Sequence, residues 1–97
     1  MADTLCNAVG CTSARHRSQF MCLPHWTRLP APLRQQINAT WRAYQGAGMG
    51  ERGAALLDYH QACDEAKRWT AEGEGRLGDF TPEAPRFQRL LERMEGE

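Results

Sequence analysis

Three segments of the chain carry apolar residues at the three- and four-residue spacing that is typical of amphipathic helices. From this spacing we predict helices over residues 31–45, 53–72 and 83–95. Their apolar stripes are Leu33, Ile37, Trp41 and Tyr44, then Leu56, Tyr59, His60, Cys63 and Ala66, then Phe87, Leu90, Leu91 and Met94. Glycine-rich stretches interrupt the pattern over residues 46–52 and 73–81, and we interpret them as loops. The pattern predicts a mainly α-helical fold.

Residues 5–30 lack this period and contain three of the four cysteines. Cys6 and Cys11 are separated by four residues, Cys22 and His25 by two, and ten residues lie between the pairs. Zinc takes four tetrahedral ligands from thiolate sulfur and imidazole nitrogen, and three cysteines with one histidine are a common structural set. We therefore predict a structural Zn²⁺ site with these four residues as its ligands.

The local sequence around the ligands favours a treble-clef-like knuckle. Gly10 allows the first cysteine pair to fold its backbone around an ion, and Pro24 suits the first turn of a short helix that carries the second pair. A tiny β-hairpin over residues 13–21 is an optional addition to this module. We expect the knuckle to pack on the helices, with Trp26 and Trp41 joining it to the first of them.

Length and charge suit a single small domain over residues 1–97. A chain of 97 residues buries a limited core and gains from a cross-link. Residues 1–20 lack the apolar segment of a secretory signal, and no stretch approaches the roughly 20 apolar residues of a membrane-spanning helix. We therefore expect a cytoplasmic protein without membrane contact, in a compartment where structural disulfides are uncommon.

The thiols and imidazoles leave alternatives open. His16 lies between the two ligand pairs and is the alternative fourth ligand. A disulfide, which the reducing compartment disfavours, and free buried thiols are the other states of the three cysteines. Cys63 lies on the apolar stripe of the second helix with no paired cysteine nearby, so we expect it in the core. His60, one turn earlier, is expected to be tucked in or half-exposed.

The neutral net charge hides an asymmetry between the two halves of the chain. Residues 1–50 carry five arginines and one aspartate, a net charge of +4, and the remainder carries seven basic and eleven acidic residues, a net charge of −4. The basic first half suits a polyanion, and the acidic second half suits a basic surface. The candidate partner-binding residues are Arg15, Arg17, Arg28, Arg34, Asn38 and Arg42.

The sequence carries no pattern that is typical of catalysis. A catalytic zinc keeps one coordination position open, whereas four candidate ligands are present here. Asp3 is the only carboxylate among the first fifty residues, and the H-E-x-x-H and H-x-E…C-x-x-C arrangements are absent. We therefore predict a protein that is not an enzyme.

Residues 5–45 resemble a group of small phage- and prophage-encoded zinc-finger-like proteins. In that group C-x₄-C is followed by M-C-x-x-H-W, a Leu/Val-Pro step, a Leu-Arg pair and a helix that ends in an aromatic residue. The matching residues are Cys6, Cys11, Met21, Cys22, His25, Trp26, Leu29, Pro30, Leu33, Arg34 and Tyr44. After them, the group's Pro-Gly-Gln turn and shorter helix are replaced by a glycine-rich loop, a longer helix and an extra C-terminal segment.

The resemblance implies a metal-binding, non-enzymatic phage accessory protein in the cytoplasm of a bacterial host. We expect such a protein to act by binding a host or phage protein, for example by inhibiting a host defence complex. Nucleic-acid binding through the arginine-rich first half is the alternative. Against it, the cysteine spacing differs from that of C₂H₂ fingers, and no basic run is interleaved with aromatic residues.

Overall fold

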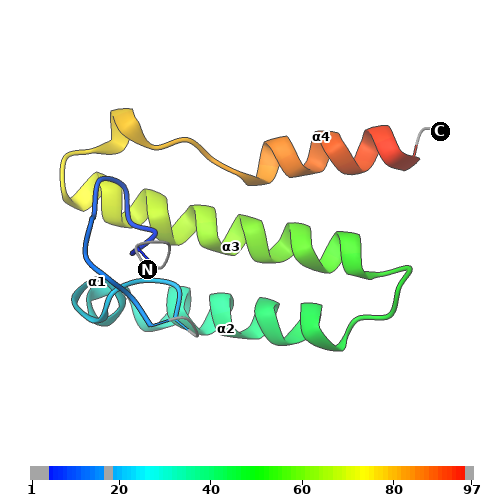
Figure 1. Cartoon of the computed structure of the whole chain (residues 1–97), viewed down its shortest axis with the longest axis horizontal. Coiled ribbons are helices and arrows are strands. Elements are labelled where there is room, and N and C mark those ends of the chain that lie inside the picture. The colour runs from blue at the N-terminus through cyan, green and yellow to red at the C-terminus, as the bar shows by residue number, and fades with distance from the viewer. Residues whose placement is uncertain (1–4, 17–18, 96–97) are drawn as a thin grey trace.

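The computed structural model describes residues 5–16 and 19–95. In these residues the chain forms four α-helices, α1 (Leu23–Arg28), α2 (Ala31–Gly46), α3 (Arg52–Gly73) and α4 (Ala84–Glu95), and a 3₁₀ turn, η1 (Leu77–Asp79). The helices α2, α3 and α4 run antiparallel to their neighbours with α3 in the middle (Figure 1). The N-terminal loops and α1 cover the end where α2 begins and α3 ends (Figure 1). The mainly α-helical fold is confirmed.

Local sequence explains where the helices begin and end. The three long helices start and stop within one residue of the predicted ranges. A proline lies in the first turn of both α1 and α2, where a missing backbone N–H costs nothing. None of the helices in the described ranges combines the length and the apolar character needed to cross a bilayer.

The described residues of the expected β-hairpin, 13–16 and 19–21, do not pair with one another, and residues 17 and 18 of this range lie outside the described part of the chain. The structure has one isolated antiparallel bridge within its described part, between Leu5 and Ala14. The Cys6 N–H donates to the Ser13 carbonyl at 2.9 Å. The bridge therefore closes the loop that contains the first cysteine pair, because the ends of that loop have to meet if both thiols are to face the same point.

The core lies where the N-terminal module (residues 5–30) packs on α2 and α3. Met21 and Leu29 are its largest fully buried side chains. Ile37 of α2 and the small residues Ala62 and Ala66 of α3 belong to the same cluster. The alanines give α3 a flat face, so the module and α2 can approach its backbone closely.

The two expected joining tryptophans lie at different depths. Trp26 is half-buried against the core cluster. Trp41 is 41% exposed, and its ring packs against Tyr44 and Tyr59 at centroid distances of 5.5 and 5.0 Å. Trp26 thus supports the junction between the module and the helices, whereas the ring contacts of Trp41 connect α2 with α3.

A buried carboxylate attaches α4 to α3. Asp64 is 8% exposed, and its Oδ1 and Oδ2 accept hydrogen bonds from the backbone N–H groups of Glu83 (2.9 Å) and Ala84 (2.8 Å). The first amides of a helix have no intrahelical acceptor, so Asp64 acts as an N-cap that comes from another helix. Lys67 Nζ lies 3.8 Å from the same carboxylate.

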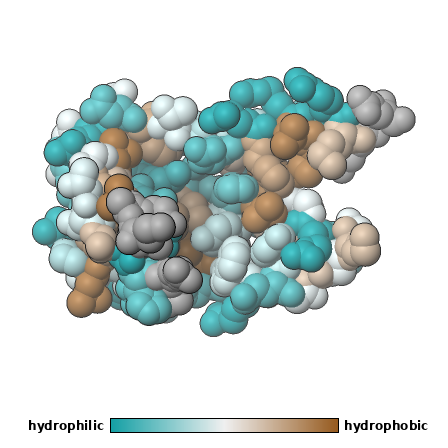
Figure 2. All heavy atoms as spheres, viewed as in Figure 1, coloured by the Kyte–Doolittle hydropathy of each residue, from teal (hydrophilic) through white to brown (hydrophobic). Residues whose placement is uncertain are grey.

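The packing of α4 loosens toward its C-terminus. At the beginning of α3, Gly53 faces Leu91 so closely that a Cβ on Gly53 would lie 3.0 Å from Leu91 Cδ2. Leu90, next to this contact, is 50% exposed, and Met94, about one turn further along α4, is 67% exposed. Figure 2 shows apolar side chains on the inner side of α4, toward α3, and hydrophilic ones on its outer side.

We expect the substitution Asp64→Ala to lower the free energy of unfolding by about 2 kcal/mol, because two α4 amides lose a charged acceptor. Amide hydrogen exchange in residues 84–95 should accelerate more than exchange in α2. The matched control is Asp58→Ala, which removes an exposed carboxylate from the same helix and should change stability by less than about 0.5 kcal/mol. Equal losses in urea denaturation of the two variants would contradict the capping role.

Candidate metal centre

The four predicted ligands converge on one point. The three Sγ atoms of Cys6, Cys11 and Cys22 and a ring nitrogen of His25 all lie within 4.8 Å of one another. Cys6 and Cys22 are buried, and Cys11 and His25 are half-buried. All of these cysteines are free thiols, so the disulfide alternative is not what the structure contains. This group can hold a metal ion.

The spacing within the group suits a small tetrahedral centre. His25 Nδ1 lies 3.2 Å from Cys22 Sγ and 3.6 Å from Cys6 Sγ. With metal–sulfur bonds of about 2.3 Å and metal–nitrogen bonds of about 2.0 Å, tetrahedral ligand atoms lie roughly 3.4–3.8 Å apart. The side chains therefore need only small adjustments to close on an ion.

Turns position the first pair of thiols. The Ala8 N–H lies 3.5 Å from Cys6 Sγ and donates to it, and the Cys11 N–H donates to the Ala8 carbonyl at 3.1 Å. Gly10 has a φ of +75°, a conformation that a residue with a side chain rarely adopts. The loop thereby turns back toward the second pair.

The short helix α1 positions the second pair. Cys22 is the residue before α1, and its carbonyl accepts the Trp26 N–H at 2.9 Å. His25 follows three residues later, and residues at this spacing share one face of a helix. Pro24 favours the helix start at this point, as the sequence predicts.

His25 has a second contact that the sequence analysis did not foresee. Its Nε2 lies 2.8 Å from Glu74 Oε2, 49 residues further along the chain. A carboxylate on one ring nitrogen keeps the proton there and leaves the other nitrogen, here Nδ1, as the acceptor that faces the thiols. Glu74 therefore orients the imidazole for metal binding.

The end of α3 places Glu74 at this position. Glu74 is the C-cap residue, and Gly75 follows it with a φ of +71°. The Arg76 N–H donates to the Ala71 carbonyl at 2.7 Å and the Gly75 N–H to the Glu72 carbonyl at 3.3 Å. These bonds form a Schellman motif, which turns the chain sharply after the helix. Gly75, which the sequence analysis assigns to a loop, thus also fixes the position of the Glu74 carboxylate that orients His25.

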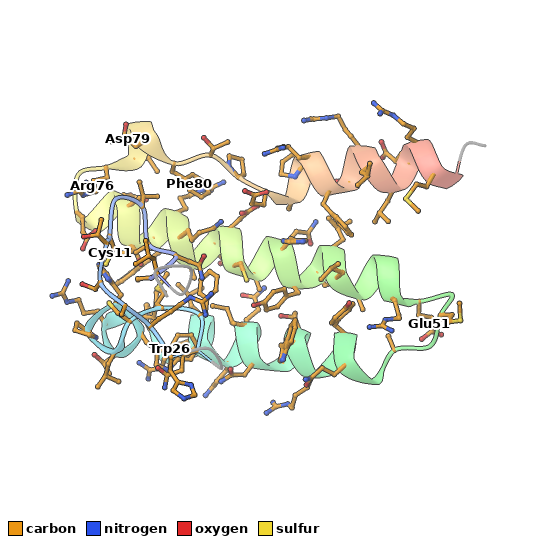
Figure 3. All side chains as sticks on the ribbon, viewed as in Figure 1. Cys11, Trp26, Glu51, Arg76, Asp79 and Phe80 are labelled. Atoms are coloured by element: carbon orange, nitrogen blue, oxygen red, sulfur yellow. The ribbon has the colours of Figure 1, made fainter. Side chains whose placement is uncertain are left out.

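Two arginines offset the negative charge of the site. Three thiolates around a divalent ion leave a net charge of −1, and the Glu74 carboxylate adds another. The Arg76 guanidinium packs on Gly10, where it fills the space that a Cβ would occupy, and Figure 3 shows Arg76 and Cys11 at the same end of the molecule. Arg28 Nη1 lies 3.6 Å from Glu74 Oε2.

The pKa values of the ligands depend on burial and on hydrogen bonds. Burial raises the pKa of the Cys6 thiol to about 11. Burial also acts to raise the pKa of Cys11, but hydrogen bonds from Ser13, Cys6 and Cys22 outweigh it and lower this pKa to about 7. Burial lowers the pKa of His25, yet hydrogen bonds with Glu74 and Cys22 outweigh it, so the net shift is upward.

The other candidates from the module lie outside this group. His16 is exposed and is not one of the four converging residues, so His25 is the fourth member. Arg15 holds the module together, because its Nε donates to the Leu5 carbonyl at 2.8 Å and its Nη1 to the Gln19 carbonyl at 2.6 Å. Arg17 lies outside the described residues.

The candidates on α2 differ in their contacts. Arg34 Nη1 donates to the carbonyls of Thr27 (3.2 Å) and Leu29 (2.8 Å), which lie at the end of α1. Asn38 and Arg42 are exposed on the two following turns of α2. Arg34 therefore links α1 to α2, and the outer two residues face solvent.

Comparison of the chain with known protein families, with curated proteins and with solved structures found no match. Fold and site therefore define the class of protein by themselves. It is a small, mainly helical protein in which a group of cysteines and one histidine near the N-terminus packs on a layer of helices and can bind a metal ion.

We expect Glu74→Gln to weaken metal binding by about tenfold or more, because partners that orient metal-bound histidines typically contribute about 10–100-fold in affinity. Competition between the protein and a chromophoric chelator for Zn²⁺ measures the change. Glu72→Gln is the matched control, since this exposed glutamate lies on the same last turn of α3. An equal affinity of both variants would show that the His25–Glu74 contact does not orient the ligand.

The thiols should react with iodoacetamide in a fixed order in the metal-free protein at pH 7. A pKa of about 7 leaves much of Cys11 as the reactive thiolate, whereas burial raises the pKa of Cys63 to about 11. Peptide mass spectrometry should therefore find Cys11 modified before Cys6 and Cys63, whose pKa values are both about 11. In urea the differences should disappear. Equal rates for Cys11 and Cys63 in the folded protein would contradict this assignment.

Proposed function

We propose that this chain is a non-enzymatic protein, stabilised by a structural Zn²⁺ ion, that acts by binding another protein. The observation that carries the proposal is the complete set of four converging ligands, with the histidine oriented by Glu74. A site that fills all four tetrahedral positions with protein atoms has no place for a substrate or a reactive water. Its role is then to hold residues 5–30 in shape.

Zinc is the metal that fits this donor set best. Three thiolates with one imidazole in a tetrahedral arrangement suit Zn²⁺, whereas magnesium and calcium prefer oxygen ligands. Since metal ligands must be deprotonated and metal-binding sites of this kind form on folding, binding and folding of the module are coupled.

A protein partner is favoured by the side chains that the fold leaves accessible. Trp41 and Trp69 are 41% and 43% exposed, and tryptophan, tyrosine and arginine are the residues that contribute most often to binding energy in protein interfaces. The arginines Arg15 and Arg34 donate to backbone carbonyls, which reduces the number of guanidinium groups available to phosphates.

The resemblance of residues 5–45 to phage-encoded zinc-finger-like proteins supplies the biological setting of the proposal. The proposed partner is a protein of the phage or of its bacterial host. One form of the proposed binding activity is inhibition of a host defence complex. Nucleic-acid binding is the second candidate, because Asn38 and Arg42 are exposed one turn apart on α2. The phosphates of a duplex or of a single strand would contact these two side chains.

Native mass spectrometry tests the metal. We expect one bound Zn²⁺ per chain and none in the double variant Cys22→Ser/His25→Ala. Cys63→Ser removes the cysteine outside the group and should retain the metal, which makes it the control. Chelation should accelerate hydrogen exchange in the N-terminal residues through residue 30 more than in α2 and α3. Full occupancy of the double variant would refute the ligand set.

Two binding experiments separate the candidate functions. A gel shift with random DNA and RNA at low and high salt should show no complex with the zinc-bound protein. Affinity capture from a bacterial lysate should retain a protein on the zinc-loaded chain and not on the Cys22→Ser/His25→Ala variant.

A shift that collapses as salt rises would instead favour nucleic acid, since release of counterions makes phosphate contacts salt-dependent. Its loss in Arg42→Ala would assign it to α2. Arg42 suits this test better than Arg34, whose guanidinium bonds the end of α1 and whose loss would disturb the fold.

A further inference from the structure

A cavity with aromatic walls lies between the N-terminal module, α2 and α3. Its volume is about 500 Å³, and the rings of Phe20, Trp26, Trp41 and Tyr59 line it. None of the four metal ligands lines it, so it is separate from the metal centre. Trp26, which is labelled in Figure 3, contributes the wall from α1. We call this space the aromatic cavity.

The walls of the aromatic cavity are held in place by contacts within the fold. The rings of Trp41 and Tyr59 pack with their centroids 5.0 Å apart and an interplanar angle of 50°. The Asn7 Nδ2 donates to the Phe20 carbonyl at 2.6 Å, and Ile37 closes the floor as a buried residue. A preformed site loses little conformational entropy when it is filled.

The rim of the cavity is polar and basic. Asn38 lines it from α2, and Arg42 lies one turn further along the same helix. Arg15 lines it from the module. None of the described residues that line the cavity is acidic. The rim therefore complements negative charge, in the half of the chain that carries a net charge of +4.

We propose that the aromatic cavity is a docking site for an acidic peptide segment of a protein partner. One large apolar side chain of the segment enters between the rings, and neighbouring aspartates or glutamates face Asn38 and Arg42. This inference rests on the proposed function and specifies the surface and the chemistry of the partner.

A peptide fits the cavity better than a nucleic-acid strand does. Successive bases stack on parallel aromatic faces and need a basic groove along the phosphates. Here Trp41 is tilted by 36° to Tyr44 and by 50° to Tyr59. A single half-open pocket with aromatic walls is the shape that receives one anchor side chain.

Selection from a displayed library of random twelve-residue peptides tests the proposal with the zinc-bound chain. We expect the enriched peptides to share one large apolar residue flanked by aspartate or glutamate. The best of them, made without tryptophan, is then titrated by intrinsic fluorescence. The substitution Trp69→Phe leaves only Trp26 and Trp41 as reporters, and both line the cavity.

Two variants with the same charge change locate the binding site. Asn38→Glu adds a negative charge to the rim and should weaken peptide binding at least about tenfold, because like charges in an interface are strongly unfavourable. Gln35→Glu adds the same charge to an exposed position of α2 that does not line the cavity, and should change affinity by less than about twofold. Native mass spectrometry confirms that both variants keep their zinc.

Several outcomes would overturn the proposal. One is the absence of acidic, apolar-anchored peptides among those selected, and another is an equal loss of affinity in both glutamate variants. Quenching of the two tryptophans by a twelve-residue oligo(dT), abolished by Asn38→Glu, would assign the cavity to nucleic acid. Self-association that Asn38→Glu abolishes, measured by sedimentation, would assign it to a second copy of the chain.

The result also distinguishes this inference from the proposed function. Capture of a protein partner that Asn38→Glu does not weaken would leave protein binding in place and exclude the cavity as its site. Failure of both the capture and the peptide selection would reject protein binding itself.

Discussion

The contact between His25 and Glu74 joins the two parts of this protein. On its Nδ1 side the imidazole faces the thiols of Cys6 and Cys22, and on its Nε2 side it bonds the last turn of α3 at 2.8 Å. In its described residues, 5–16 and 19–30, the module has little regular structure of its own beyond one isolated bridge and one helix of six residues. Many of the buried core residues are small, so apolar burial contributes less than in a core of large side chains. The Glu74 contact and the burial of Met21 and Leu29 hold the module on the helices, and a metal ion bound by the four ligands would add to this attachment.

Part of this arrangement is predictable from local patterns, because local patterns have local causes. The apolar period places α2, α3 and α4, and the spacing of Cys6, Cys11, Cys22 and His25 predicts a ligand set whose side chains converge in the structure. The features that local patterns do not predict are contacts between residues that lie far apart in the sequence. Glu74 acts on a residue 49 positions earlier, and Asp64 caps a helix 20 positions later. Neither carboxylate differs in sequence from a solvated glutamate or aspartate on a helix, so only the tertiary structure reveals its role.

The roles of the arginines likewise depend on tertiary contacts that the sequence does not show. A net charge of +4 over residues 1–50 indicates a basic surface, and this excess is spread over a few isolated arginines. In the fold, Arg15 and Arg34 bond backbone carbonyls at the edges of the module, and Arg28 lies beside Glu74. Backbone carbonyls at the end of a short helix need donors, and a guanidinium group supplies several. Charge counts cannot separate such structural arginines from those that meet a partner.

The metal centre and the aromatic cavity are separate sites, yet one short segment builds both. Residues 20–26 contain Phe20 and Trp26, which line the cavity, and also Cys22 and His25, which converge on the metal position. Met21 between them is fully buried, so the segment is fixed by packing as well as by ligation. A metal ion bound at this position would therefore help to set the positions of two walls of the cavity. In a chain too short for a large core, ligation can supply the rigidity that a preformed binding surface requires.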